Sequence, residues 1–461
     1  MNFFAQTRPL WMSQDRSIWV ISMMALVAGC GGGGGGASAS NPPQSATANA
    51  TLSINSGVTY GTVTTTYEAT SVMVDYGARA HLADVGPIPD LPGKGTTIAV
   101  IDDFKSIHAS TTTFPRIYRA INAHTSSSSI PENYSAIYSV PYQIDTSYTH
   151  GDLVSSIAGG YATAPSALTL KVPAYDTADL FSCTLSYQAK QLACPQTFHA
   201  NAPASSLQAS LSMPPIPGVA SDATILPLRV DLSDSQNAVN TNAAIYGHLI
   251  NSLSSSLVNV INLSLGSDMP VSTTPAKDIQ AIMDAYSIPS SIAINAVITI
   301  SAGNSSTPCG INYFGCNIHA MALVLPPTSD INSKSTTASS TLVVGALTGT
   351  GTAQTIARYS TFPGQLASRL IFASGDTGFF QDAGGNNAVG TSFAAPRVSG
   401  VAAIIKQQFP KLTSDQIATI ILQSADRDMN NDGTPDFMGV DPIYGNGKLS
   451  LKNALALAAT Y

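Results

Sequence analysis

A serine stands at the start of a long apolar segment near the C-terminal end of the chain. Residues 390–400 read Gly-Thr-Ser-Phe-Ala-Ala-Pro-Arg-Val-Ser-Gly, and the apolar run 401–405 follows. Small residues therefore bring Ser392 to the beginning of a predicted helix, where N–H groups and the helix dipole favour a developing negative charge. This placement suits a nucleophile, and the small neighbours let a substrate backbone come close. The alternative is the closely packed start of a buried helix.

Three more polar side chains stand at the ends of predicted elements. Asp102 directly follows a predicted buried strand, His150 stands at the start of a predicted helix, and Asn304 follows another predicted strand. Taken alone, Asp102 has a simpler interpretation as a cap, His150 as a surface loop residue and Asn304 as a turn residue. Their occurrence together with Ser392, in the order Asp, His, Asn, Ser, favours catalysis.

The elements that would position these side chains alternate along the chain from residue 93. Continuous apolar segments are typical of parallel strands buried on both faces, and helical segments lie between them. The predicted strands are 97–101, 223–230, 259–265, 296–301 and 342–347. The predicted helices are 152–159, 242–253, 277–286, 392–408 and 414–423, the last after a capping-box pattern at Thr413. This alternation predicts an α/β fold, in which functional groups gather beyond the carboxyl ends of the strands.

In this order the motifs resemble those of the subtilase family, the subtilisin-like serine proteases of peptidase family S8. The resemblance runs from about residue 93 to 458. Besides the segments already named, the matching blocks are 260–266 (Val-Ile-Asn-Leu-Ser-Leu-Gly), 342–346 and 444–449. The resemblance implies a three-layer subtilisin-like fold, with a mainly parallel central sheet and helices on both of its faces.

The resemblance also implies a serine endopeptidase that hydrolyses peptide bonds through an acyl-enzyme. Ser392 would be the nucleophile, His150 the general base and acid, and Asp102 the residue that orients the imidazole. The Asn304 side chain and the Ser392 N–H would bind the oxyanion. The implied substrate-binding residues are Ser264, Leu265 and Gly266, which would pair with the substrate backbone, and Ser301, Ala302 and Gly303, which would line the first specificity pocket with them.

The sequence departs from the family pattern after the first strand, and this leaves one role open. The family usually has Asp-Thr-Gly or Asp-Ser-Gly there, whereas this chain has Asp102-Asp103-Phe104. Asp103 is therefore a rival for the catalytic acid, and Asp102 is preferred because it directly follows the strand. The sequence does not separate a general endopeptidase from a protease that matures other exported proteins.

Two other functions are weighed against a protease. One is a catalytically inactive subtilase-like binding or adhesion module, against which the complete set of four polar residues argues. The other is an α/β-hydrolase esterase, which needs a Gly-x-Ser-x-Gly elbow and the order Ser, Asp, His. The chain has Ala394 where that elbow needs its second glycine, and the order differs.

The N-terminus has the pattern of an export signal. Arg8 and Arg16 precede the apolar segment 18–27, which is too short to span a bilayer, and the chain then reaches Ala-Gly-Cys at Cys30. This ending resembles the lipobox of bacterial lipoproteins, which implies cleavage before Cys30 and a lipid on that cysteine. The alternative is an ordinary signal peptide that is cut slightly later. We therefore expect an exported protein that is lipid-anchored to a bacterial membrane, at the outer membrane or the cell surface.

The predicted organisation has four parts. They are a lipoprotein signal peptide at 1–29, the lipidated cysteine with a Gly- and Ser-rich tether at 30–50, an extended N-terminal segment at 51–92, and a catalytic domain at 93–461 with an insertion at 160–220. Because little chain lies between the tether and the catalytic domain, we expect folding without a propeptide domain.

Composition and cysteine content limit the partners and the compartment. Only 10% of the 461 residues are charged, the net charge is −7, and no basic run occurs, so nucleic acid is not expected as a partner. Two close cysteine pairs, Cys183–Cys194 and Cys309–Cys316, predict disulfides in an oxidising compartment, with buried free thiols as the alternative. We expect a monomer that acts on protein or peptide substrates and contacts the membrane through its lipid anchor.

One C-terminal loop resembles a cation site. Residues 428–436 follow the pattern Asp-x-Asn-x-Asp-Gly-x-x-Asp, which matches the opening of a calcium loop, although the bidentate Glu at the twelfth position is missing. The candidate ligands are Asp428, Asn430, Asp432 and Asp436. The alternative is a solvated turn rich in Asp and Asn. No cofactor is expected to be required for catalysis, and any calcium here would be structural.

Overall fold

The fold comes from a computed structural model of the chain. The residues that it describes are 47–55, 66–75, 89–102, 104, 121–122, 150–159, 161–162, 167–172, 184–186, 191–193, 205–212, 216–229, 247, 249–250, 253, 258–266, 288–289, 295–309, 317–324, 334–335, 337–349, 354–381 and 387–461. The predicted signal peptide, the predicted helix at 277–286 and the residues Cys30, Asp103, Cys183, Cys194 and Cys316 lie outside them.

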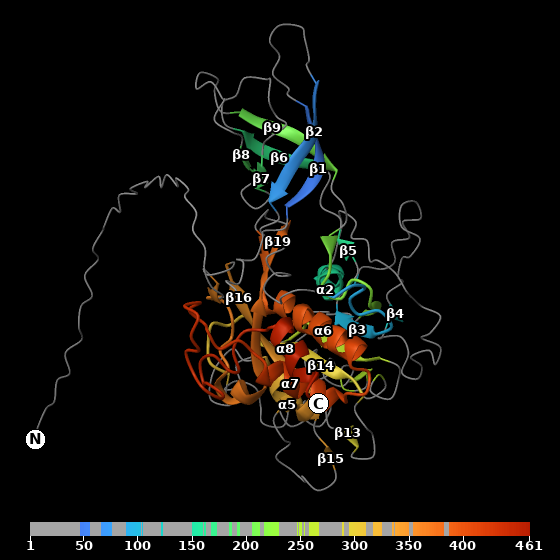
Figure 1. The fold of residues 1–461 in the computed structure, drawn as a ribbon, viewed down its shortest axis with the longest axis vertical. Coiled ribbons are helices and arrows are strands. Elements are labelled where there is room, and N and C mark those ends of the chain that lie inside the picture. The colour runs from blue at the N-terminus through green and yellow to red at the C-terminus, as the bar shows by residue number, and fades with distance from the viewer. Residues whose placement is uncertain are drawn as a thin grey trace, which may run out of the picture. The chain divides into compact units, whose positions relative to one another are not determined.

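The centre of the described structure is a mainly parallel sheet (Figure 1). Its strands follow the order β17-β16-β14-β12-β3-β11-β4, with β18 also paired to β16, and only the β16–β17 pair is antiparallel. The strands are β3 (Thr97–Asp102), β4 (Ile121–Asn122), β11 (Thr224–Arg229), β12 (Val260–Leu263), β14 (Val297–Ser301), β16 (Thr341–Thr348), β17 (Thr355–Ile356) and β18 (Leu370–Ser374). The predicted fold class is confirmed, and all five predicted strands are present with ends that differ by at most two residues.

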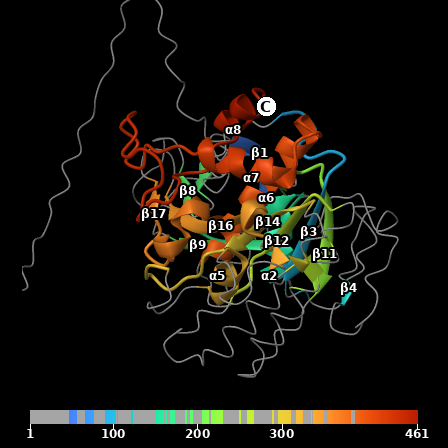
Figure 2. The same cartoon turned by 90° about the horizontal axis from the view of Figure 1, so that it is seen from below.

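Helices cover both faces of this sheet (Figure 2). Successive side chains of a strand point to opposite faces. Ile98 and Val100 of β3 accordingly belong to one hydrophobic cluster, and Ala99 and Ile101 belong to another. The first cluster includes α2 (His150–Ala158), α6 (Thr391–Gln408), α7 (Ser414–Gln423) and α8 (Leu451–Ala458), and the second includes α5 (Ile318–Val324). The described layers are therefore helix, sheet and helix, as predicted.

Helix α7 begins where its capping pattern predicts. Thr413 Oγ1 accepts a hydrogen bond from Gln416 N at 3.2 Å, and Gln416 Oε1 accepts one from Thr413 N at 2.9 Å. These reciprocal bonds satisfy two N–H groups at the helix start, and such a cap stabilises a helix by about 1 kcal/mol.

The N-terminal segment and the insertion form a second sheet of their own. Its strands are β1 (Thr47–Asn55), β2 (Thr66–Asp75), β6 (Ala167–Val172), β7 (Thr184–Ser186), β8 (Gln191–Ala193) and β9 (Ser205–Ser212), which close into a barrel in the order β1-β2-β7-β8-β6-β9. β1 pairs antiparallel with both β2 and β9. The sequence predicts an extended segment and a separate surface insertion, whereas the structure pairs the two. β1 also begins inside the stretch predicted as a tether, and the domain boundaries themselves stay predictions.

Short ribbons complete the described strands. They are β5 (Tyr161–Ala162) with β10 (Ile216–Pro217), β13 (Ile288–Pro289) with β15 (Lys334–Ser335), and β19 (Asp376–Gln381) with β20 (Asn387–Val389). Two 3₁₀ turns, η4 (Thr337–Ser340) and η6 (Gly364–Arg369), directly precede β16 and β18 respectively. The ribbon of β19 and β20 leads directly into the start of α6, which carries Ser392.

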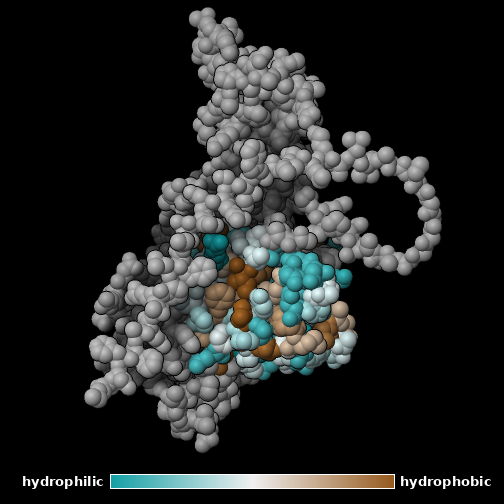
Figure 3. Space-filling view, turned by 90° about the vertical axis from the view of Figure 1, so that its left-hand side faces the viewer, coloured by the Kyte–Doolittle hydropathy of each residue, from teal (hydrophilic) through white to brown (hydrophobic). Residues whose placement is uncertain are grey.

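The described surface mixes apolar and polar residues. Figure 3 shows one face on which hydrophobic residues lie among hydrophilic ones. The C-terminal loops contribute exposed apolar side chains, including Met438, which is 87% exposed, and Ile443. Within the described ranges, no helix has both the length and the apolar character needed to cross a membrane.

We expect the fold to lose stability in acid, because α5 contains the buried histidine His319. Burial lowers the pKa of His319 from 6.5 to about 4, so the folded protein keeps it neutral while the unfolded chain protonates it below about pH 6.5. Stability should therefore fall as the pH drops from about 6.5 to about 4, by about 3 kcal/mol in total. We expect His319→Gln to flatten the pH dependence of the melting temperature across this range. If the melting temperatures of the parent and the variant changed equally with pH, the lowered pKa would not belong to His319.

Candidate active site

Asp102 and His150 come together at the carboxyl end of β3. Asp102 is the last residue of β3, and His150 is the first residue of α2. His150 Nδ1 lies 2.8 Å from Asp102 Oδ1, the Asp102 side chain is fully buried, and the His150 side chain is 36% exposed. Because the carboxylate contacts the ring at Nδ1, proton exchange with a nucleophile would use Nε2.

The start of α6, which carries Ser392, lies near this pair. Helix α6 begins at Thr391, and no side chain caps it at Gly390. The ring of Phe393, the residue after Ser392, has its centroid 5.4 Å from that of His150. The structure therefore brings the helix start that carries Ser392 against the histidine. A helix start of this kind presents N–H groups that can bind an anion.

Pro396 inside α6 changes the hydrogen bonding of Ser392. Proline has no N–H, so the carbonyl four residues earlier, which belongs to Ser392, loses its helical partner. Ser264 Oγ supplies that bond instead and donates to Ser392 O at 2.7 Å. The segment that follows β12 is thereby fixed to the backbone of the candidate nucleophile.

Asn304 faces the same helix start. Its Oδ1 accepts hydrogen bonds from Thr391 N and Thr391 Oγ1, both at 3.0 Å, and these bonds set the orientation of the amide. A Cβ atom placed on Gly390 would lie 3.6 Å from Asn304 Nδ2 and 3.7 Å from Ser392 N. Two N–H donors, Asn304 Nδ2 and Ser392 N, therefore lie at similar distances from the same point beside Gly390. Paired donors of this kind can stabilise an oxyanion.

The six residues predicted to bind substrate lie at the ends of β12 and β14, which are neighbours in the sheet. Ser264 and Leu265 are buried, and Gly266 is exposed. Ser301 ends β14, and Gly303 N donates to Thr391 Oγ1 at 3.2 Å. The two segments therefore meet the start of α6, and their contacts with a substrate stay a prediction.

A buried polar network under α6 was missed by the sequence reasoning. Thr299 Oγ1 lies 2.6 Å from Ser399 Oγ, and Ser399 Oγ donates to Asn262 Oδ1 at 3.0 Å. Asn262 Nδ2 donates to Ser264 Oγ at 2.9 Å, and Ser264 Oγ holds Ser392 O. The network joins the sheet centre to the candidate nucleophile. Its signal in the sequence is a polar residue in the middle of an apolar strand, as in Val-Ile-Asn-Leu and Val-Ile-Thr-Ile.

Arg397 is another residue for which the sequence predicted no role. It is fully buried in α6. Its guanidinium donates to Ser374 O, to Phe393 O at 2.5 Å and to Asp376 O at 2.6 Å. Arg397 therefore ties the first turns of α6 to the junction between β18 and β19.

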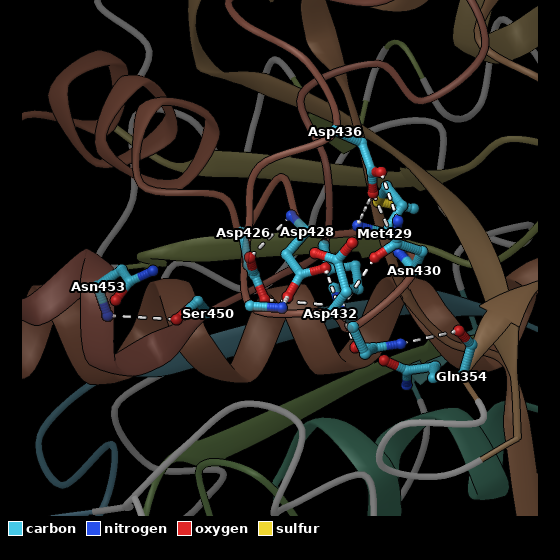
Figure 4. Close-up of polar contacts among 12 residues, drawn as sticks. Gln354, Asp426, Asp428, Met429, Asn430, Asp432, Asp436, Ser450 and Asn453 are labelled. Carbon is cyan, nitrogen blue, oxygen red and sulfur yellow. Dashed lines mark hydrogen bonds and ion pairs between the residues drawn. The ribbon is translucent and has the colours of Figure 1, made fainter. Parts of the chain in front are cut away.

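The loop predicted to bind calcium is held by its own polar groups (Figure 4). The Asp428 carboxylate accepts from Asp432 N at 3.0 Å and from Gly433 N at 2.8 Å. The Asp436 carboxylate accepts from Asn430 N at 3.0 Å and from Asn430 Nδ2 at 2.8 Å. Among the residues described, no three or more His, Cys, Asp or Glu side chains are placed to hold a metal ion. A cation in this loop would need the Asn430 oxygen, backbone oxygens or water in addition to the carboxylates.

The cysteine pairs are seen only in part. Cys309 is buried and disulfide-bonded, whereas Cys316 lies outside the described residues. Cys183 and Cys194 also lie outside them; in the sequence, Cys183 directly precedes β7 and Cys194 directly follows β8. The pairings Cys309–Cys316 and Cys183–Cys194 therefore stay predictions.

A family model and several known proteins match this chain. The model of the subtilase family (Peptidase_S8) matches residues 93–447. An extracellular serine protease of Serratia marcescens is 33% identical over 101 residues, which cover 22% of this chain and 9% of that protein. A calcium-dependent protease of Trichormus variabilis is 37% identical over 89 residues, 19% of this chain and 13% of that protein. The matches thus span only a small part of either relative.

A solved structure shows similarity over a longer stretch. The structure of Sphericase is 19% identical with a TM-score of 0.45, and the match covers 81% of this chain and 97% of that one. The family match at 93–447 includes all four residues for which catalytic roles are predicted, Asp102, His150, Asn304 and Ser392.

Proposed function

Because this chain belongs to the subtilase family, we propose that it is a serine endopeptidase that hydrolyses peptide bonds in protein or peptide substrates. The observation that carries the proposal is the contact of 2.8 Å between His150 Nδ1 and buried Asp102, beside the helix start that bears Ser392. A carboxylate, an imidazole and a hydroxyl in this order are the groups that nucleophilic acyl transfer needs.

The proposed reaction begins when Ser392 Oγ attacks the peptide carbonyl carbon. His150 Nε2 takes the hydroxyl proton and then gives it to the leaving amine, while Asp102 stabilises the imidazolium. Asn304 Nδ2 and the Ser392 N–H bind the oxyanion that forms on the carbonyl oxygen. A water molecule then attacks the acyl-enzyme by the same route, which releases the carboxylic acid product and restores the Ser392 hydroxyl.

The proposal is tested by labelling and hydrolysis together. Purified protein is treated with a fluorophosphonate probe, the labelled peptide is identified by mass spectrometry, and casein hydrolysis is followed with and without the probe. We expect the label on Ser392 and a complete loss of hydrolysis after labelling. Well-folded protein that neither takes the label nor cleaves casein would show that the function is not proteolysis.

Calcium is proposed as a structural ligand of the 428–436 loop, because the carboxylates and the Asn430 amide lie in one tight turn and a relative is named a calcium-dependent protease. Weak extracellular calcium sites bind at roughly 0.1–1 mM, so 10 mM calcium should stabilise the fold by about 1–3 kcal/mol. We expect calcium to raise the melting temperature by a few degrees, and Asp428→Ala to abolish the rise. Equal melting temperatures in calcium, magnesium and EDTA would remove calcium from the proposal.

Membrane attachment is proposed from the sequence around Cys30. A lipidated Cys30 would hold the folded enzyme on a membrane surface through acyl chains. We expect the parent protein to sediment with membranes after expression in a bacterial host, and Cys30→Ala to move into the soluble fraction. Equal sedimentation of the two proteins would show that Cys30 is not the anchor.

A further inference from the structure

Asn317 joins the two strand ends that form the proposed substrate site. It is fully buried and directly precedes α5. Its Nδ2 donates to Ser301 O at 2.7 Å and to Leu265 O at 3.2 Å, and its backbone N donates to Ala302 O at 3.3 Å. Leu265 follows β12 and Ser301 ends β14, so one residue bonds to both predicted walls of the first specificity pocket.

The Asn317 amide also fills the space beside Gly266. A Cβ atom on Gly266 would lie 2.3 Å from Asn317 Nδ2 and 2.4 Å from Asn317 Cγ, so a side chain at position 266 would displace the amide. Gly266 is exposed whereas Asn317 is buried. The buried amide therefore lies against exposed Gly266 and is bonded to both predicted walls.

Two demands explain why this residue is asparagine. Asn317 Oδ1 accepts a hydrogen bond from His319 N at 3.1 Å, which caps the first turn of α5. Serine, threonine and aspartate can cap a helix in this way, but none of them has an amide NH₂ group to donate to two carbonyls. An aspartate here would place a carboxylate oxygen against the carbonyls of Ser301 and Leu265.

We propose that Asn317 closes the base of the first specificity pocket and restricts the enzyme to peptides with a small side chain, such as Ala or Ser, on the residue whose carbonyl is attacked. This inference rests on the proposed endopeptidase function. A larger side chain has to push the amide aside, which leaves the buried carbonyls of Leu265 and Ser301 without that donor. The free energy lost with these two hydrogen bonds offsets the free energy gained by burying the larger side chain. A small side chain leaves the amide in place.

The test compares Asn317→Ser with the parent protein. Serine keeps an oxygen that can cap α5, but it removes the amide and both of its bonds to the walls. The measurement is kcat/KM for peptides that differ only in Ala, Leu or Phe at the residue before the cleaved bond, with active sites counted by fluorophosphonate titration. The matched control is Ser450→Ala, which removes the cap of another helix, where Ser450 Oγ accepts from Asn453 N at 3.3 Å.

We expect the parent protein to prefer Ala over Phe, and Asn317→Ser to raise the Phe-to-Ala ratio of kcat/KM by about tenfold or more. Ser450→Ala should leave the ratio unchanged. A ratio in Asn317→Ser within about threefold of the parent, or a parent that prefers Phe, overturns the inference and leaves the endopeptidase function standing.

Two further outcomes separate the inference from the function. If the parent protein is neither labelled nor active on any peptide, the function and the inference fail together. If Asn317→Ser does not fold, the cleavage sites of the parent protein in denatured casein decide the matter. Enrichment of small residues before the cleaved bonds supports the inference, and its absence overturns it.

Discussion

Ser392→Ala is expected to lower kcat by about 10⁶-fold and to leave the fold intact. This magnitude is the loss measured for the nucleophile of subtilisin, another member of the family. The fold should survive because Ser264 Oγ holds the backbone carbonyl of Ser392, which does not depend on the side chain. The measurements are kcat on a chromogenic peptide and the melting temperature by circular dichroism.

The double variant gives this prediction its control. If Ser392 and His150 act as one unit, His150→Ala alone should cost about as much as Ser392→Ala, and the double variant should lose no more than either. A residual rate above the uncatalysed reaction is expected, because Asn304 Nδ2 and the Ser392 N–H still bind the oxyanion. Losses that multiply in the double variant, or a loss below about a hundredfold in either single variant, would contradict a Ser–His pair.

The elements that position these residues were predictable because their signals are local. Apolar runs such as 97–101 are nearly continuous, and a strand buried on both faces has that composition. The start of α6 is likewise marked by small residues before an apolar run, and α7 by its capping box. The structure then adds what local patterns do not contain, the distance of 2.8 Å between His150 Nδ1 and Asp102 Oδ1.

The parts that were missed depend on pairing between distant segments. Asn262 and Thr299 lie directly opposite each other in the register of β12 and β14, and Ser399 meets both from α6. Nothing within any one of the three segments indicates those neighbours. The barrel has the same origin, because β1 of the N-terminal segment pairs with β9 inside the predicted insertion, far away in the sequence, and neither strand is strongly apolar. Asn317 gave no signal in the sequence, since its role exists only where two strand ends and a helix start meet.

The departure at Asp102-Asp103 leads to the second large effect. Asp102→Asn is expected to lower kcat by about 10⁴-fold, because an amide in place of the carboxylate no longer fixes the productive tautomer of His150 or stabilises its positive charge. Asp103→Asn is the matched control, since it makes the same change at the next residue, and it should lower kcat by less than about tenfold. The reason for the difference is that Asp102 is the fully buried carboxylate in contact with His150 Nδ1.

The comparison decides between the two carboxylates directly. Both variants are measured at the same pH on the same peptide, with folded protein counted from the melting transition. A larger loss in Asp103→Asn than in Asp102→Asn would transfer the acid role to Asp103 and would require His150 to turn from its contact with Asp102. A large loss in both would mean that the adjacent charges act together on the imidazole, since two carboxylates beside one histidine both favour its protonated form.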